Sequence, residues 1–150
     1  MAHARRKLFE AHEFNRSETA GQAVTLIAKL YEIEREARDL EPQARKLLRQ
    51  ARSKPIADVL HAWLTANRQA LAKADVTAKA IDYSLSNWAA LTCFLDDGNV
   101  PIDNNAAENS VRPLAIGRRN WLFVGSQQAG KHEGIVLSLI ESAKLNGHDP

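Results

Sequence analysis

The sequence predicts a mainly α-helical protein that ends in a smaller, incomplete α/β piece. Apolar residues recur at helical spacing through most of residues 1–97. After residue 100 the pattern changes to a short polar helix, a strand-like run at 121–124 and a last helix. One strand or hairpin leaves backbone N–H and C=O groups without partners, so it requires further strands from elsewhere. We therefore expect a helical region over 1–97 and part of an α/β core over 98–150.

Three amphipathic helices are expected in the first region. A capping box fits Thr19–Gln22, Ser53 with Pro55 predicts the start of a second helix, and Thr77 is the candidate cap of a third. Apolar residues follow each start at helical spacing, and both tryptophans among them are expected as core anchors rather than ligand-stacking residues. These stripes are Val24, Ile27, Ala28 and Tyr31, then Ile56, Val59, Leu60, Trp63 and Leu64, then Ile81, Leu85, Trp88 and Leu95.

For three features of this region we prefer a structural role over a catalytic or metal-binding one. The charged run 32–39 is typical of a solvated helix face. The turn Asp96-Asp97-Gly98 is expected to end a helix, and a metal site there is the less favoured alternative. Cys93 lies in an apolar helical run, which favours a buried reduced thiol over a nucleophile.

Composition and charge narrow the class of protein. Hydrophobic content of 45% and charged content of 25% are ordinary for a soluble globular chain. No apolar run approaches the roughly 20 residues of a membrane span, and no apolar signal core follows the basic N-terminus, so we expect a cytoplasmic protein without a membrane partner. The net charge of +2 does not by itself indicate nucleic acid, but basic residues cluster at Arg5–Lys7, Arg45–Lys46, Arg49–Lys54 and Arg118–Arg119.

The segment Pro101–Pro113 is expected to form a short helix bounded by prolines. Asp103 is a good N-cap candidate, because its carboxylate can accept from the first backbone N–H groups of a helix. Pro113 ends the helix, because the residue before a proline is pushed out of the α region.

Glu108 lies on that helix among amides and a guanidinium. Asn104, Glu108 and Arg112 recur every four residues and share one face, and Asn105 flanks it. From residue types alone, the favoured interpretation is a solvated Glu108–Arg112 pair worth about 0.3–0.5 kcal/mol. The alternative is a functional carboxylate, since an acid flanked by amides and a guanidinium is costly to bury and unusual on a protein surface.

The last helix is expected to carry an apolar stripe and to stop at Asn146-Gly147. Before it, residues 125–132 nearly match a phosphate-binding loop, but His132 stands where the pattern requires a magnesium-binding Ser or Thr. We therefore reject an NTPase and keep a weaker hypothesis, that this helix start holds a DNA phosphate with Lys131 and His132. The stripe consists of Ile135, Val136, Leu139, Ile140 and Ala143.

Several motifs occur in a fixed order along essentially the whole chain. They are His3-Ala4-Arg5-Arg6-Lys7, Ile102–Glu108, Val111-Arg112-Pro113, Gly117–Asn120, Phe123–Ser126 and Glu141–Gly147. Together they resemble the C-terminal region of bacterial insertion-sequence-66 family transposases, and their number, order and spacing make the resemblance specific.

The resemblance implies a DDE-class transposase with a ribonuclease-H-like catalytic core, in which three acids hold two Mg²⁺ or Mn²⁺ ions. In that family a mostly helical segment, here residues 1–97, is inserted before the third acid. The glutamate of the Asp-Asn-Asn-x-x-Glu motif is that acid, and it maps onto Glu108 as catalytic residue and metal ligand. Asn104 and Asn105 would orient Glu108 or touch DNA. The expected DNA phosphate contacts are Arg112, Arg118, Arg119 and Lys131.

The family's first two catalytic aspartates lie upstream of the segment that resembles Met1–Lys7. One carboxylate cannot hold a metal pair, so we expect a fragment that binds no ion stably and neither cuts nor joins DNA alone. Its expected partners are transposon-end DNA and either the rest of a transposase or a second copy. The alternative function is a non-catalytic helical module over Val24–Leu95, which binds DNA or oligomerises and modulates an intact transposase.

Overall fold

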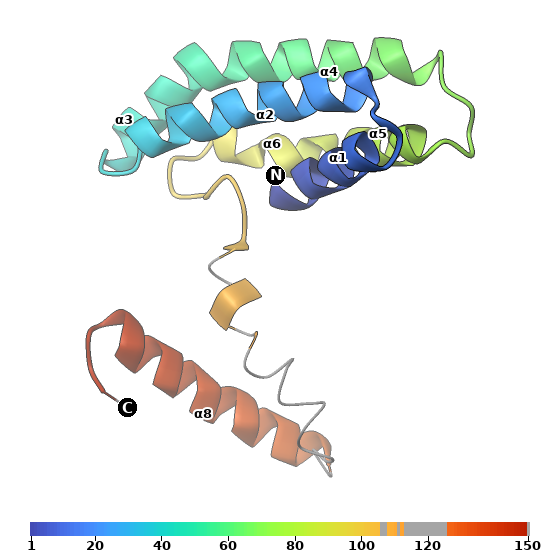
Figure 1. The fold of residues 1–150 in the computed structure, drawn as a ribbon. Coiled ribbons are helices and arrows are strands. Elements are labelled where there is room, and N and C mark those ends of the chain that lie inside the picture. The colour runs from blue at the N-terminus through green and yellow to red at the C-terminus, as the bar shows by residue number, and fades with distance from the viewer. Residues whose placement is uncertain (106–107, 111, 113–125, 150) are drawn as a thin grey trace. The chain divides into compact units, whose positions relative to one another are not determined.

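A computed structural model describes residues 1–105, 108–110, 112 and 126–149 (Figure 1). The chain divides into two compact units, Met1–Asp103 and Asn104–Pro150. Within the described residues the regular structure is helical and includes no strand, which confirms the mainly α prediction. The strand predicted at 121–124 lies outside the described residues, and the ribonuclease-H-like core stays a prediction.

The first unit is built from packed helices. In Figure 1, α2 and α4 run side by side over a second layer that contains α1, α5 and α6. In chain order the segments are α1 (Ala2–Asn15), α2 (Glu18–Glu36), α3 (Pro42–Leu48), the π-helical η1 (Arg49–Ser53), α4 (Lys54–Arg68), α5 (Val76–Ser86), α6 (Trp88–Thr92) and the 3₁₀ turn η2 (Cys93–Leu95).

The core of this unit lies between the two helix layers. Alanines alternate with larger apolar side chains on the buried faces, so neighbouring helices can approach closely. Val24, Tyr31, Trp63 and Trp88 pack against the core while partly exposed, whereas Val59, predicted as a core residue, is 56% exposed. The buried set includes Ala4, Leu8, Ala20, Ala23, Ile27, Leu30, Ala57, Leu60, Leu64, Ile81, Phe94, Leu95 and Ile102.

The caps of α2 and α5 lie two residues before the predicted ones. The Ser17 hydroxyl accepts from the Ala20 backbone N–H at 3.3 Å, so Thr19 belongs to the first turn of α2. The Asp75 carboxylate accepts from the backbone N–H groups of Thr77 and Ala78 at 2.6 and 3.3 Å. Thr77 is buried and accepts instead from the Asn15 side-chain amide. Both threonines were poorer candidates because a free polar cap stood just upstream.

The α-helix α4 begins at Lys54 with Pro55 in its first turn, as predicted, but Ser53 makes no side-chain cap and the helix continues an earlier one. The helix that begins at Pro42 continues through η1 into α4, and the Lys54 N–H donates to the Arg49 carbonyl across a wider π turn. Proline lacks an N–H and its ring crowds the preceding turn, and a π turn accommodates both inside a continuous helix. Ser53, predicted as an N-terminal signal, is buried within this turn.

Arg49 is the largest fully buried side chain described, and it joins three parts of the unit. Its Nη1 donates to the backbone carbonyls of Phe94, Asp97 and Val100 at 2.8, 2.9 and 3.0 Å. Its Nε and Nη2 bind both carboxylate oxygens of Glu34 on α2. Glu34 is therefore an exception to the solvated face predicted for 32–39.

A second arginine, Arg45, also binds the loop that follows η2. Its guanidinium donates to the carbonyl of Gly98 and to three carbonyls that follow α2, at 2.9 to 3.1 Å. Gly98 lies so close to the start of α3 that an added Cβ would be 1.8 Å from the Pro42 carbonyl oxygen. The predicted turn at 96–98 is confirmed, and the compact unit extends past the predicted boundary at residue 97 to Asp103.

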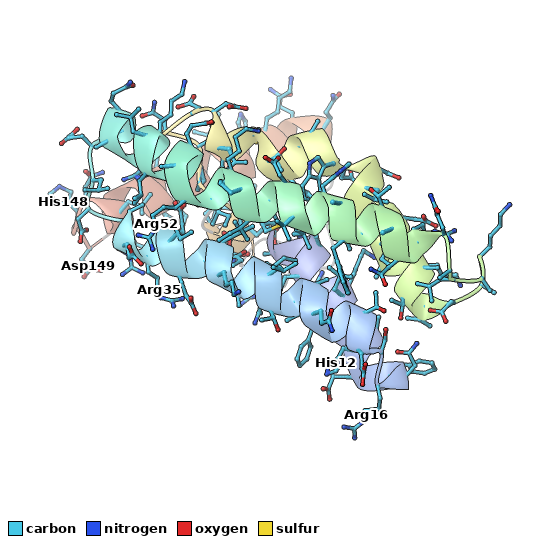
Figure 2. All side chains as sticks on the ribbon, turned by 90° about the horizontal axis from the view of Figure 1, so that it is seen from above. His12, Arg16, Arg35, Arg52, His148 and Asp149 are labelled. Atoms are coloured by element: carbon cyan, nitrogen blue, oxygen red, sulfur yellow. The ribbon has the colours of Figure 1, made fainter. Side chains whose placement is uncertain are left out.

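Two arginines of the basic cluster at 45–54 are engaged inside the fold, while Arg52 and Lys54 form exposed ion pairs. Arg45 and Arg49 bind carbonyls and Glu34, Arg52 pairs with Glu36, and Lys54 lies 3.6 Å from Asp58. Figure 2 shows Arg52 with Arg35 at one end of the helical unit, and His12 with Arg16 at the opposite end. Arg45 and Arg49 therefore have structural roles, whereas Arg52 and Lys54 remain at the surface.

Cys93 is exposed, so the prediction of a buried thiol is wrong. The helix changes to 3₁₀ geometry at this residue, which turns Phe94 and Leu95 into the core and leaves Cys93 outside. Its Sγ lies 3.1 Å from the Ala90 carbonyl oxygen.

In the second unit the long helix α8 (Gln127–Leu145) is capped at both ends. The Ser126 hydroxyl accepts from the Ala129 N–H at 3.1 Å. At the other end the His148 N–H donates to the Ala143 carbonyl and the Gly147 N–H to the Lys144 carbonyl, with Gly147 at φ 73°. This pair of bonds is a Schellman motif, so the stop predicted at Asn146-Gly147 is confirmed. Across the described ranges, no helix combines the length and apolarity needed to cross a membrane.

We predict that Arg49→Met lowers the unfolding free energy by about 3–5 kcal/mol, because Glu34 and buried carbonyls lose their partner. Arg52→Met is the matched control, since it also faces a glutamate of α2 but is exposed. Chemical denaturation of both variants measures the difference. Equal, small effects of the two substitutions would show that the buried arginine does not hold the unit together.

Candidate functional site

The segment that leads into the Glu108 helix is fastened to the helical unit. Ile102 is buried in the core. The Tyr31 hydroxyl of α2 donates to Oδ2 of Asp103 at 2.9 Å. Burial of the phenol and this hydrogen bond to Asp103 raise the pKa of Tyr31 well above its usual value. The first acid of the polar motif is therefore held by α2.

The predicted short helix is present among the described residues from Asn105 onward, one residue later than an N-cap at Asp103 requires. Asn105, Glu108, Asn109, Ser110 and Arg112 are helical. The Glu108 N–H donates to the Asn104 carbonyl at 2.9 Å, which is the bond of a first helical turn. A turn of this kind places Asn104 and Glu108 on one face.

The side chains of this helix are accessible. Asn104, Asn105, Glu108 and Arg112 are all exposed. A carboxylate on such a surface can receive a metal ion or a substrate from solvent, and it can equally form a surface ion pair. The geometry of this helix alone therefore leaves open the two interpretations that its spacing allowed.

The start of α8 carries two further candidate contacts for a DNA phosphate. Lys131 and His132 are exposed in the second turn, just after the N–H groups at the helix start. One of these N–H groups is already taken by the Ser126 hydroxyl. Arg118 and Arg119, the other predicted phosphate contacts, lie outside the described residues, as do Pro113 and the strand-like run.

The carboxylates of the Asp96-Asp97 turn serve as hydrogen-bond acceptors within the loop rather than as a metal site. Oδ1 of Asp97 accepts from the backbone and side-chain N–H groups of Asn99 at 2.8 and 3.0 Å, and these bonds hold the pKa of Asp97 below its usual range. The Asp96 carboxylate accepts from Gln50 at 2.9 Å. Within the described ranges, no three His, Cys, Asp or Glu side chains converge as a metal would need.

Tyr31 is the residue at this site that sequence reasoning missed. It was assigned to an apolar stripe, because a tyrosine at helical spacing looks like core. The only signal was that a buried tyrosine hydroxyl requires a hydrogen-bond partner, and nothing in the sequence indicated that the partner lies 72 residues away.

The family model described as "Transposase IS66 family" matches residues 1–132, which include the helical unit, the Glu108 helix and the first turns of α8. The chain belongs to the IS66 family of transposases. The recognised resemblance is thereby confirmed, and a transposase-related role follows from it.

Similar proteins of Sinorhizobium fredii (strain NBRC 101917 / NGR234) extend the match over the rest of α8. The uncharacterized proteins y4jD and y4hP are 40% and 39% identical over 100% and 99% of this chain, and y4qI is 36% identical over 99%. The IS66-family chain spans 28–29% of the length of these relatives. No solved structure matches the chain.

We predict that Tyr31→Phe removes about 1 kcal/mol of stability at neutral pH, because the Asp103 carboxylate loses a donor. The folded state raises the Tyr31 pKa above the unfolded value of about 10. The stability that Tyr31 contributes is therefore complete below about pH 10 and is lost as pH rises above it. Denaturation at pH 7.5 and 10.5 should show a larger loss for the wild-type chain than for Tyr31→Phe. Equal losses would contradict the Tyr31–Asp103 anchor.

Proposed function

We propose that this chain supplies the third acid, Glu108, and part of the DNA phosphate contacts of a two-metal transposase site. The observation that carries the proposal is the IS66 family match, which covers the Asp-Asn-Asn-x-x-Glu motif at residues 103–108 within residues 1–132. The exposure of Glu108 and its place at the start of a short helix support this role.

The described carboxylates do not by themselves fit the two-ion site that the family implies. No cluster of three potential ligands occurs among them. Asp103, the nearest acid in sequence, is engaged by Tyr31. A Mg²⁺ or Mn²⁺ pair supplies Lewis-acid activation in phosphodiester chemistry when it is bound, and Glu108 would provide one carboxylate to it. The remaining acids must come from polypeptide outside these 150 residues.

The phosphate contacts are assigned to exposed cations near this acid and at the start of α8. Arg112 and Lys131 are exposed, and a guanidinium or ammonium at such positions can hold a phosphate without reading sequence. Arg118 and Arg119 complete the proposed set. Asn104 shares a face with Glu108, where its amide can orient the carboxylate or touch the DNA strand.

The alternative, a non-catalytic helical module, has one observation in its favour. Residues 1–103 contain a closed core and form a compact unit. Two arginines of its largest basic cluster, Arg45 and Arg49, are engaged internally, however. This favours a scaffold for the Glu108 segment over an independent DNA-binding module.

We predict that the purified chain shows no Mg²⁺- or Mn²⁺-dependent nicking or joining of transposon-end DNA. One carboxylate cannot hold the ion pair that in-line displacement requires. A supercoiled plasmid that carries transposon ends is the substrate, and conversion to open circles is measured on gels. Metal-dependent turnover that disappears in Glu108→Ala would overturn this prediction.

We also predict salt-dependent DNA binding in which Arg112→Ala and Lys131→Ala each reduce the slope of log K against log salt by about 0.9. Arg52→Ala is the control, because this cation is already paired with Glu36. Fluorescence anisotropy with labelled duplex from 50 to 200 mM salt gives the slopes. Unchanged slopes in the first two variants would remove both residues from the phosphate-contact set.

A further inference from the structure

The helix that carries Glu108 is too short to be stable by itself. Only residues 104–112 lie between Asp103 and Pro113, and helices shorter than about 12–15 residues are marginal in water because their first turn is costly to nucleate. The described residues from Asn105 onward are nevertheless helical, and the Glu108 N–H donates to the Asn104 carbonyl at 2.9 Å. Contacts outside the helix must therefore offset the cost of its first turn.

The chain immediately before this turn is fixed by contacts within the helical unit. Ile102 belongs to the core, and the Met1 nitrogen donates to its carbonyl oxygen at 3.0 Å. The Tyr31 hydroxyl donates to Oδ2 of Asp103 at 2.9 Å. Both of these residues belong to the same compact unit, so the contact is defined within one body. A chain already held at 102 and 103 loses less conformational entropy when the residues after it form a turn.

The same contact holds a carboxylate next to the helix start. Asp103 lies two residues before Asn105, the first helical residue. A carboxylate is favoured close to the first N–H groups of a helix, where the backbone dipoles leave a partial positive charge. Tyr31 holds this carboxylate from α2, and the charge of Arg5 on α1 also acts on the phenol. Two helices from much earlier in the chain therefore bear on the place where the Glu108 helix begins.

We propose that Tyr31 is a positioning residue of the transposase site, which acts through Asp103 to keep the helix of Glu108 formed. This role rests on the proposed function of Glu108, because a carboxylate serves as a ligand at a fixed place only while its backbone is ordered. Tyr31 acts on Asp103 and not on the reacting groups. Loss of the contact loosens the first turn and leaves Glu108 on an irregular segment.

Nuclear magnetic resonance on the intact chain tests this coupling. The Cα chemical shifts of Glu108–Ser110 report the ratio of helical to non-helical chain at this place. We expect Tyr31→Phe to lower that ratio about fivefold, the effect of one lost hydrogen bond. The shifts of α2 and α4 should stay the same, because the core of the helical unit is retained.

Tyr83→Phe is the matched control. Tyr83 is also partly buried against the core, but its ring contacts Lys7, whose Nζ lies 4.9 Å from the ring centroid. This variant should keep the helical ratio of the wild-type chain. Unchanged shifts in Tyr31→Phe, or equal changes in the two variants, would overturn the proposal.

Substitutions of Asp103 separate this coupling from general destabilisation. Asp103→Ala should lower the helical ratio as Tyr31→Phe does. Asp103→Asn keeps an acceptor for the phenol and should retain more helix than Asp103→Ala. In the Tyr31→Phe background, Asp103→Ala should cost less than it does alone, because the two side chains form one contact. Additive effects would show that the two residues act independently and would contradict the role of Tyr31.

This readout requires neither metal nor DNA, so it is separate from the tests of the proposed function. Glutamine and glutamate favour helix to a similar degree, so Glu108→Gln should keep the helix and its dependence on Tyr31. If Glu108 fails as the third acid, the coupling remains and its role in the reaction is refuted. If the coupling is absent, the role of Tyr31 is refuted and Glu108 stays as proposed.

Discussion

Arg49 carries its charge into the centre of the helical unit, where an unpartnered guanidinium would cost several kcal/mol. Its donors meet the Glu34 carboxylate on α2 and three carbonyls of residues 94–100. The loop after η2 must therefore return to η1, and α2 must lie alongside. Arg45 fixes the same loop through Gly98, where there is no room for a side chain. Two arginines thus determine the path of the chain as it leaves the helices.

That path determines what the helical unit can contribute to function. The loop held by Arg49 continues to Ile102 in the core and to Asp103 on Tyr31. The Glu108 helix begins within two residues of this anchor. The helical unit thus fixes the chain up to Asp103, the first residue of the Asp-Asn-Asn-x-x-Glu motif.

The helical content and the Asn146-Gly147 stop followed from spacing and local turn chemistry, which the sequence displays directly. The caps predicted at Thr19 and Thr77 were wrong because stronger caps lay two residues upstream. The α-helix predicted to start at Ser53 and Pro55 does begin there, but a π turn joins it to the helix before it. The roles of Arg49 and Tyr31 could not be predicted, because the carbonyls that Arg49 binds and the Asp103 carboxylate that Tyr31 binds lie 45 to 72 residues away. A basic cluster looks the same in sequence whether it binds carbonyls or phosphates. The role of Glu108 came from the family motif, since its i,i+4 spacing with Arg112 is also that of an ordinary surface pair.

If Arg49 ties residues 94–100 to α2 and α4, these segments unfold as one cooperative body. Native-state hydrogen exchange on the intact chain can measure this. We expect protected amides at Leu30, Leu60 and Leu95 to exchange with one common opening free energy, the behaviour of a single cooperative unit. Exchange at Leu95 and its neighbours that is much faster than in α2 and α4 would show that the loop opens without breaking the bonds of Arg49.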